Sequence, residues 1–122
     1  MKKGFFCTLI SLLALSACGQ QETVAYESLV WVNNYYLDHP VQTVSATAGG
    51  WLFRGAQEFK SEIRVEFIIP EPMNPDRAKR QALLRSICPA KSEVIWQTLP
   101  SKNKIVISVQ TKDRKFTDSR VC

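Results

Sequence analysis

The sequence predicts an α+β domain in which a small antiparallel sheet packs one or two helices on one face. Three observations indicate this fold class. Apolar and polar residues alternate over 58–69 and 104–110, as they do in half-buried strands. A proline-bounded segment with helical spacing, residues 74–88, lies between them. The chain has 122 residues, of which 45% are hydrophobic and 22% charged, and this suits one globular domain.

Residues 1–17 are predicted to be an export signal. Lys2 and Lys3 give it a positive start, and residues 5–15 form a mostly apolar run. That run is too short for a bilayer, which takes about 20 residues, but it suits a signal peptide. An ordinary secretory signal, cut after Ala17, would leave Cys18 as a plain thiol.

The end of this signal, Leu15-Ser16-Ala17-Cys18, resembles the lipobox of bacterial lipoproteins. The resemblance implies that diacylglycerol is attached to the Cys18 thiol and that Cys18 becomes the mature N-terminus, which usually receives a further acyl chain such as palmitate. Two or more acyl chains hold a protein on a membrane stably. Gly19 stands where an aspartate would retain such a lipoprotein at the inner membrane, so the resemblance implies the outer membrane, facing the periplasm.

The mature protein is therefore expected to consist of residues 18–23, a lipidated cysteine with a short tether, and a single domain, residues 24–122. Its 14 basic and 11 acidic side chains give +3, divided into −4 over residues 18–75 and +7 over residues 76–122. We interpret this asymmetry as a solvated surface, with steering of a charged partner as the alternative. Export argues against nucleic acid as a partner.

Two cysteines remain for a disulfide, because Cys7 leaves with the signal and Cys18 carries the lipid. In an oxidising compartment Cys88 and Cys122 have one possible pairing. The bridge would join the end of the main helix to the last strand. A redox-active pair is the alternative, but the sequence has no C-x-x-C motif.

The N-terminal part of the domain is predicted to hold a helix and a hairpin. Residues 24–37 carry apolar side chains at helical spacing, although their aromatic and β-branched content would also suit a strand. The expected buried face comprises Tyr26, Leu29, Val30, Asn33 and Leu37. Residues 41–48 and 51–54 flank Gly49-Gly50, which predicts a two-residue hairpin turn.

Residues 58–69 are predicted to be one strand, with Ser61 interrupting its apolar row. The expected core face comprises Phe59, Ile63, Val65, Phe67 and Ile69. The expected solvent face comprises Glu58, Lys60, Glu62, Arg64 and Glu66, which cross-strand ion pairing explains.

The C-terminal part is predicted to hold a helix, a short helical piece and a hairpin. Asn74 is the expected N-cap and Pro75 the first helical residue. The expected apolar stripe comprises Ala78, Ala82, Leu83 and Ile87, with Leu84 as a further candidate. Ser92 is a candidate cap for a short piece before Pro100, and strands follow at 104–110 and 116–122.

The sequence offers no pattern for catalysis, metal binding or a cofactor. His39 is the single histidine, and no G-x-S-x-G or paired Cys-His arrangement accompanies it. There is no cluster with metal-ligand spacing and no phosphate-binding glycine motif. We therefore expect no enzyme, no catalytic residue, no metal and no cofactor.

Six large aromatic residues are many for so small a domain: Trp31, Tyr35, Tyr36, Trp51, Phe53 and Trp96. Core packing accounts for such residues in most proteins. An exposed subset would instead mark a binding surface. The sequence leaves both interpretations open.

The element order behind the lipobox resembles the α/β-type pilotins of type II secretion systems. The resemblance rests on Cys18, the strand 62–69, the helix end Leu83-Leu84-Arg85-Ser86-Ile87-Cys88 and the close Phe116-Thr117-Asp118-Ser119-Arg120-Val121-Cys122. It implies a lipoprotein that binds a segment of an outer-membrane secretin subunit, in a groove between helix and sheet. Residues 24–53 match no motif of that family.

The function expected is therefore that of a lipid-anchored accessory protein that binds a protein partner of a cell-envelope machine. A pilotin-like secretin-assembly factor is the first form of this hypothesis. A conjugation or type IV secretion accessory lipoprotein is the second, and an inhibitory or exclusion lipoprotein is the third.

Overall fold

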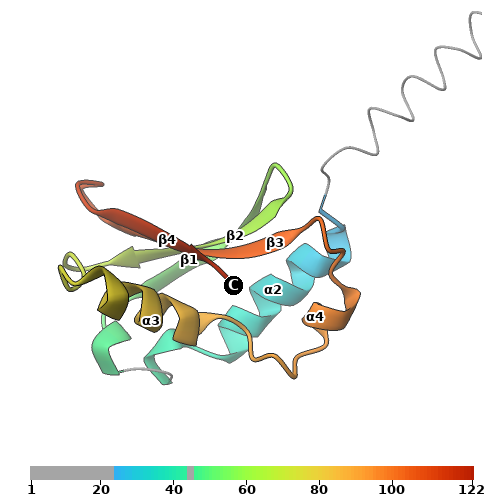
Figure 1. Cartoon of the computed structure of the whole chain (residues 1–122), viewed down its shortest axis with the longest axis horizontal. Coiled ribbons are helices and arrows are strands. Elements are labelled where there is room, and N and C mark those ends of the chain that lie inside the picture. The colour runs from blue at the N-terminus through green and yellow to red at the C-terminus, as the bar shows by residue number, and fades with distance from the viewer. Residues whose placement is uncertain (1–23, 44–45) are drawn as a thin grey trace, which may run out of the picture.

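The computed structural model describes residues 24–43 and 46–122; the predicted signal and tether lie outside them. The elements in chain order are α2 (Tyr26–Asp38), the 3₁₀ turns η1 (Val41–Thr43) and η2 (Ala46–Ala48), β1 (Leu52–Phe59), β2 (Glu62–Ile69), α3 (Arg77–Ile87), α4 (Ile95–Thr98), β3 (Lys104–Thr111) and β4 (Thr117–Val121). The α-helices lie against one face of a four-stranded sheet, and no described element covers the other face (Figure 1). The predicted α+β class is confirmed.

The sheet has the order β1-β2-β3-β4 and is mostly antiparallel. Both outer pairs are antiparallel, and β3 with β4 is the C-terminal hairpin that the sequence predicted. The central pair, β2 and β3, is parallel, so the prediction of a purely antiparallel sheet is wrong there. Parallel strands need a long crossover connection, usually through a helix. The segment with α3 and α4 provides that crossover and covers the sheet on its helix side.

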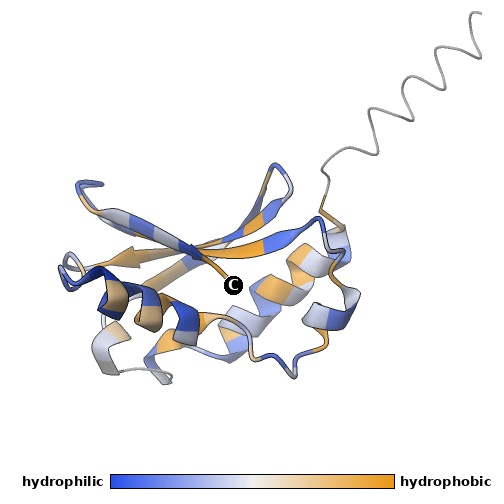
Figure 2. Ribbon diagram, viewed as in Figure 1, coloured by the Kyte–Doolittle hydropathy of each residue, from blue (hydrophilic) through white to orange (hydrophobic). Residues whose placement is uncertain are grey.

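The core lies between the central strands and the helices. The inward side chains of both strands are almost completely buried: Ile63, Val65, Phe67 and Ile69 from β2, and Ile105, Ile107 and Val109 from β3. The four from β2 were predicted as core residues, and the three from β3 are alternate residues of the predicted strand 104–110. Figure 2 shows the result as apolar stretches in the central strands and a mainly polar α3.

The predicted single strand over residues 58–69 is wrong, because the chain reverses inside it. Phe59 pairs with Glu62 at the end of the β1–β2 hairpin, and Lys60 takes a φ of 57° in the two-residue turn between them. Ser61, which interrupts the apolar row, is the second turn residue. Phe59 is consequently exposed on the uncovered face instead of buried beside Ile63.

The predicted hairpin around Gly49-Gly50 is also wrong. The chain before these glycines forms the turns η1 and η2. A Cβ added to Gly50 would lie 2.9 Å from Cγ of Pro70, so the glycine signal reflects a close approach between chain segments. Val41 and Trp51 are buried in the core, but neither belongs to a strand.

The segment predicted as a helix over residues 24–37 is helical, but it buries a different face from the one expected. Val32 and Tyr36 lie in the core, whereas Tyr26, Val30 and Leu37 are exposed. Helical spacing could not distinguish these faces, because α2 carries apolar residues on more than one side. Contacts with distant residues choose the orientation: Tyr36 donates a hydrogen bond to the carbonyl of Ile87 at 2.8 Å.

The side chain of Asn33 covers the exposed edge of β1. Its amide nitrogen donates to the carbonyl of Ala56 at 3.0 Å, and its oxygen accepts from the Ala56 amide at 2.9 Å. This is the pair of bonds that a neighbouring strand would make. Proteins protect sheet edges in this way against unwanted strand pairing.

Replacing Asn33 by leucine is therefore expected to lower the free energy of unfolding by about 1–3 kcal/mol, because two half-buried backbone groups lose their partners. Urea denaturation at neutral pH measures the change. The matched control is Asn34→Leu on the exposed side of the same helix, expected within about 0.5 kcal/mol of wild type. Equal losses in the two variants would contradict the role assigned to Asn33.

The main helix begins later than predicted. Asp76 is its N-cap, and its Oδ1 accepts from the amides of Ala78 and Lys79 at 2.9 and 3.4 Å. Asn74, the expected cap, accepts from the Asp76 amide at 2.8 Å and so shapes the turn before the helix. The Asn-Pro-Asp sequence contains two capping side chains, and the position of the crossover decides between them.

The buried stripe of α3 differs in part from the prediction. Leu84 and Ile87 face the core and Leu83 is half-buried, but Ala78 and Ala82 are exposed. Alanine stabilises a helix on either face, so its position carries little information about burial. At the short helix, α4, Val94 stands at the N-cap in place of Ser92, without a side-chain hydrogen bond.

The buried Tyr36 hydroxyl predicts a pH dependence of stability. Burial, and next the nearby Tyr35, raise the pKa of Tyr36 well above the ordinary value of 10.0. Stability is unaffected by this group below pH 10, where it is protonated in both states. Above pH 10 only the unfolded tyrosine ionises, so stability should fall by up to about 1.4 kcal/mol per pH unit.

Urea denaturation between pH 9 and 11.5 tests this expectation. Wild type should lose stability more steeply than Tyr36→Phe, which keeps the ring and removes the ionisable group. Parallel curves for the two proteins would contradict it.

Candidate functional site

The two cysteines are joined, confirming the predicted single disulfide. Cys88 and Cys122 have a Cα–Cα distance of 5.7 Å and lie 34 residues apart in the sequence. Cys88 is the C-cap of α3, and Cys122 directly follows β4. The Cys122 amide also donates to the Ile105 carbonyl at 2.8 Å. The bridge therefore ties the end of the main helix to the edge strand and fixes the walls of the space beside it.

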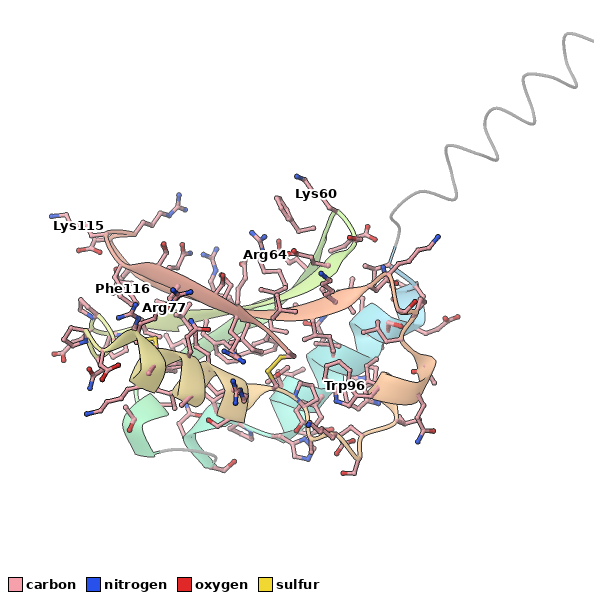
Figure 3. The ribbon with its side chains drawn as sticks, viewed as in Figure 1. Lys60, Arg64, Arg77, Trp96, Lys115 and Phe116 are labelled. Atoms are coloured by element: carbon pink, nitrogen blue, oxygen red, sulfur yellow. A yellow bond between two sulfur atoms is a disulfide. The ribbon has the colours of Figure 1, made fainter. Side chains whose placement is uncertain are left out.

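A groove with a volume of about 670 Å³ lies against this disulfide. We call it the disulfide groove; it takes Tyr35 from α2, Arg85 from α3, Lys91 from the following loop, Trp96 from α4 and Arg120 from β4. Figure 3 shows Trp96 and the disulfide on the helix side of the sheet. Elements far apart in the sequence thus converge on one concave surface.

The aromatic wall of the groove is held in place by local contacts. The Trp96 indole donates to the Pro89 carbonyl at 3.1 Å. Tyr35 stacks between Trp31 and His39 along α2, with ring centroids 5.1 and 4.4 Å away. Burial raises the pKa of Tyr35, the backbone hydrogen bond at Ala90 lowers it by less, and the Glu93 charge raises it slightly further.

The groove is cationic. Arg85, Lys91 and Arg120 belong to its lining, which includes no carboxylate side chain. Arg120 points to the helix side of β4, where its Nη1 donates to Gln81 at 3.2 Å. Its buried Nε atom has no hydrogen-bond partner among the described residues. The surface is suited to an anionic group beside an apolar one.

A second network fixes β4 to α3 next to the groove. Arg80 and Asp118 form an ion pair at 2.9 Å, and Gln81 donates to the Ser119 carbonyl at 3.3 Å. Asp118 faces the helices, as Arg120 does, because alternate residues of a strand point to the same side. Gln81 also accepts from Arg120, so the same network holds Arg120 against α3.

The residues considered for chemistry do not come together. His39 is exposed at the end of α2, where its Nδ1 lies 3.0 Å from the Tyr35 carbonyl. Within residues 24–43 and 46–122, no group of three His, Cys, Asp or Glu residues is placed to hold a metal ion. No helix in the described part of the chain is long and apolar enough to span a bilayer.

The predicted charged face of residues 58–66 is divided between two strands. Arg64 pairs with Glu62 at 3.2 Å, within β2 and not across strands as expected. The Arg64 guanidinium also lies 4.1 Å from the centroid of the Phe59 ring. Glu58 lies on β1, where it accepts from the Val24 amide. Structural contacts occupy these groups, and no pair of them forms an acid–base arrangement.

The sequence identified the disulfide and, through the resemblance, led us to expect a groove between helix and sheet, but it did not assign the residues of that groove. The six large aromatic residues fall into two groups. Tyr36 and Trp51 are core residues, whereas the other four are only partly buried. Tyr35 and Trp96 from this second group line the disulfide groove. The basic second half of the chain was the one signal that pointed towards the groove cations.

No protein-family model, curated protein or solved structure matches this chain.

Proposed function

We propose that this protein is a lipid-anchored, periplasm-facing accessory protein that binds a protein partner of a cell-envelope machine through the disulfide groove. The observation that carries the proposal is the groove itself, where three cations and two aromatic side chains surround the disulfide. Aromatic residues and arginine are the side chains that contribute most at protein interfaces. The lipobox-like segment ending in Cys18 supports the anchor.

The chemistry of the groove indicates the kind of partner. Trp96 and Tyr35 offer apolar surface with a polar end, and Arg85 and Lys91 offer charge to an acidic residue. A partner segment with an apolar side chain next to a carboxylate would complement both. Complementary charges of this type increase the association rate and the specificity of binding.

A pilotin-like role fits this arrangement best among the candidate functions. Such a lipoprotein holds a segment of a secretin subunit and carries it to the outer membrane by its own lipid. The groove lies between α3, α4 and β4, on the helix side of the sheet. Deletion of the protein should then leave the secretin at the wrong membrane, which fractionation of the envelope would measure.

Charge reversal in the groove tests the proposal. Arg85→Glu with Lys91→Glu is expected to reduce capture of the envelope partner about tenfold or more, because like charges replace complementary ones. Both side chains are exposed, so the free energy of unfolding should change by less than about 1 kcal/mol. Quantitative pull-down from envelope extracts measures the capture.

The matched control is Lys102→Glu with Lys112→Glu, which makes the same charge change at exposed sites outside the groove. It should capture the partner as wild type does. Equal capture by both double variants would remove the groove from the proposal. The identity of the captured protein then separates a secretin from a conjugation component or an inhibited enzyme.

A further inference from the structure

Helix α2 presents an apolar stripe to solvent. Tyr26, Val30 and Leu37 are 78%, 37% and 67% exposed. Their spacing places them on one side of the helix, and we call them the α2 stripe; the exposed Asn34 separates Val30 from Leu37 along it. This is most of the face that periodicity assigned to the core. Large apolar side chains exposed together on one side of a helix are a candidate site of contact with another body.

The position of the stripe in the chain indicates what covers it. Cys18, the proposed lipid attachment site, lies only eight residues before Tyr26. Even a fully extended chain of that length reaches no further than about 28 Å. The anchor therefore holds the start of α2 within about 28 Å of the bilayer surface.

We propose that the α2 stripe lies on the surface of the bilayer that holds the lipid anchor. The inference rests on the proposed lipidation of Cys18 and adds a second, protein-mediated contact. Tyr and Trp favour the membrane interface, where an aromatic ring meets both headgroups and acyl chains. Tyr26 belongs to the stripe, and Trp31 lines a shallow hollow beside it, together with Tyr26, Val30, Glu27 and Asn34.

The charges of α2 specify the type of lipid surface. The helix sequence YESLVWVNNYYLD contains two acidic residues and no lysine or arginine. Apolar contact must therefore supply the attraction, and anionic lipid should not strengthen it. A zwitterionic surface such as phosphatidylethanolamine is the expected support.

This orientation also determines the direction in which the disulfide groove faces. Tyr35 follows Tyr26 by nine residues, so at about 100° per residue it points to the opposite side of the helix. With the stripe on the bilayer, Tyr35 and the groove that it lines face the periplasm. The partner site then stays accessible while the domain rests on the membrane.

Methyl NMR on the mature chain, coupled through Cys18 to a maleimide lipid in zwitterionic nanodiscs, tests the inference. Lipids with a nitroxide in the headgroup should broaden away the methyl signals of Val30 and Leu37. Those of Leu52 and Val94, which are 66% and 49% exposed elsewhere, should be retained. Full signals from Val30 and Leu37, or equal loss at all four residues, would overturn the proposal.

A matched pair of variants gives a second readout. In mature Cys18→Ser protein, Val30→Ser with Leu37→Ser should weaken partition onto phosphatidylcholine vesicles by roughly tenfold. Val94→Ser with Leu52→Ser removes the same side chains elsewhere and should leave partition unchanged. If instead the first pair reduces partner capture and not vesicle binding, the stripe is a protein-binding surface and the inference fails.

These outcomes are independent of the proposed function. Chemical coupling replaces cellular lipidation, and the nanodisc contains no partner protein. A failure of the groove proposal would appear in the capture assay and leave the NMR result unchanged.

Discussion

Replacing Cys18 by serine is expected to release the protein from the membrane fraction. The proposal assigns to its thiol the diacylglycerol that holds the mature chain, and each buried methylene of an acyl chain contributes about 0.8 kcal/mol. No other proposed contact approaches that energy, since the α2 stripe offers only a few exposed side chains. Fractionation of the cell envelope, followed by immunoblotting of pellet and supernatant, measures the change.

The matched control is Cys7→Ser. Cys7 lies within the predicted signal, so its replacement removes a thiol without touching the lipid site and should leave the protein in the pellet. Cys18→Ser protein that remains in the washed pellet to the same extent as wild type would refute the lipid anchor.

Removing the disulfide is expected to lower the free energy of unfolding by about 4 kcal/mol. The estimate follows from the chain-entropy relation for a bridge that spans 34 residues. A domain of about 100 residues is stable by only about 5–15 kcal/mol, so this loss is a large share of the total. Urea denaturation of Cys88→Ala with Cys122→Ala, compared with oxidised wild type, measures it.

The same variant should lose partner binding before it unfolds, because β4 is a short edge strand and its end is tied to α3 by Cys122. In this variant, amide hydrogen exchange should become faster than in wild type, and the increase should be larger in β4 than in β2. A reductant should lower the free energy of unfolding of wild type to that of the variant and leave the value of the variant unchanged. A stability loss below about 1 kcal/mol would contradict the role given to the bridge.

The two central strands show how much of a strand's burial and length its local sequence pattern predicts. Strand period and burial coincide in β2, where each inward residue meets the core. In β3 the inward residues are buried too, and so is the outward Val106. The pattern failed at Lys60-Ser61, where a hairpin turn reverses the chain within an apparently continuous strand. A turn that contains no glycine, with lysine at positive φ, carries no local signal strong enough to reveal it.

Helix α2 shows the complementary limit. Its helical state followed from local spacing, but the choice of face depended on Asn33 reaching Ala56 and on Tyr36 reaching Ile87. Those partners lie 23 and 51 residues away in the sequence. An amphipathic pattern identifies a buried face only when one side of the helix is clearly polar.

The sequence alone determined the α+β class, the inward faces of the central strands and the single disulfide, because alternation, helix signals and cysteine number are local or countable properties. It also supplied the prediction of a lipid anchor. Tertiary structure alone decided the parallel central pair, the exposed α2 stripe and the residues that line the disulfide groove. Each of these depends on which distant segments pack together, and that choice is made by the total burial and hydrogen bonding of the fold.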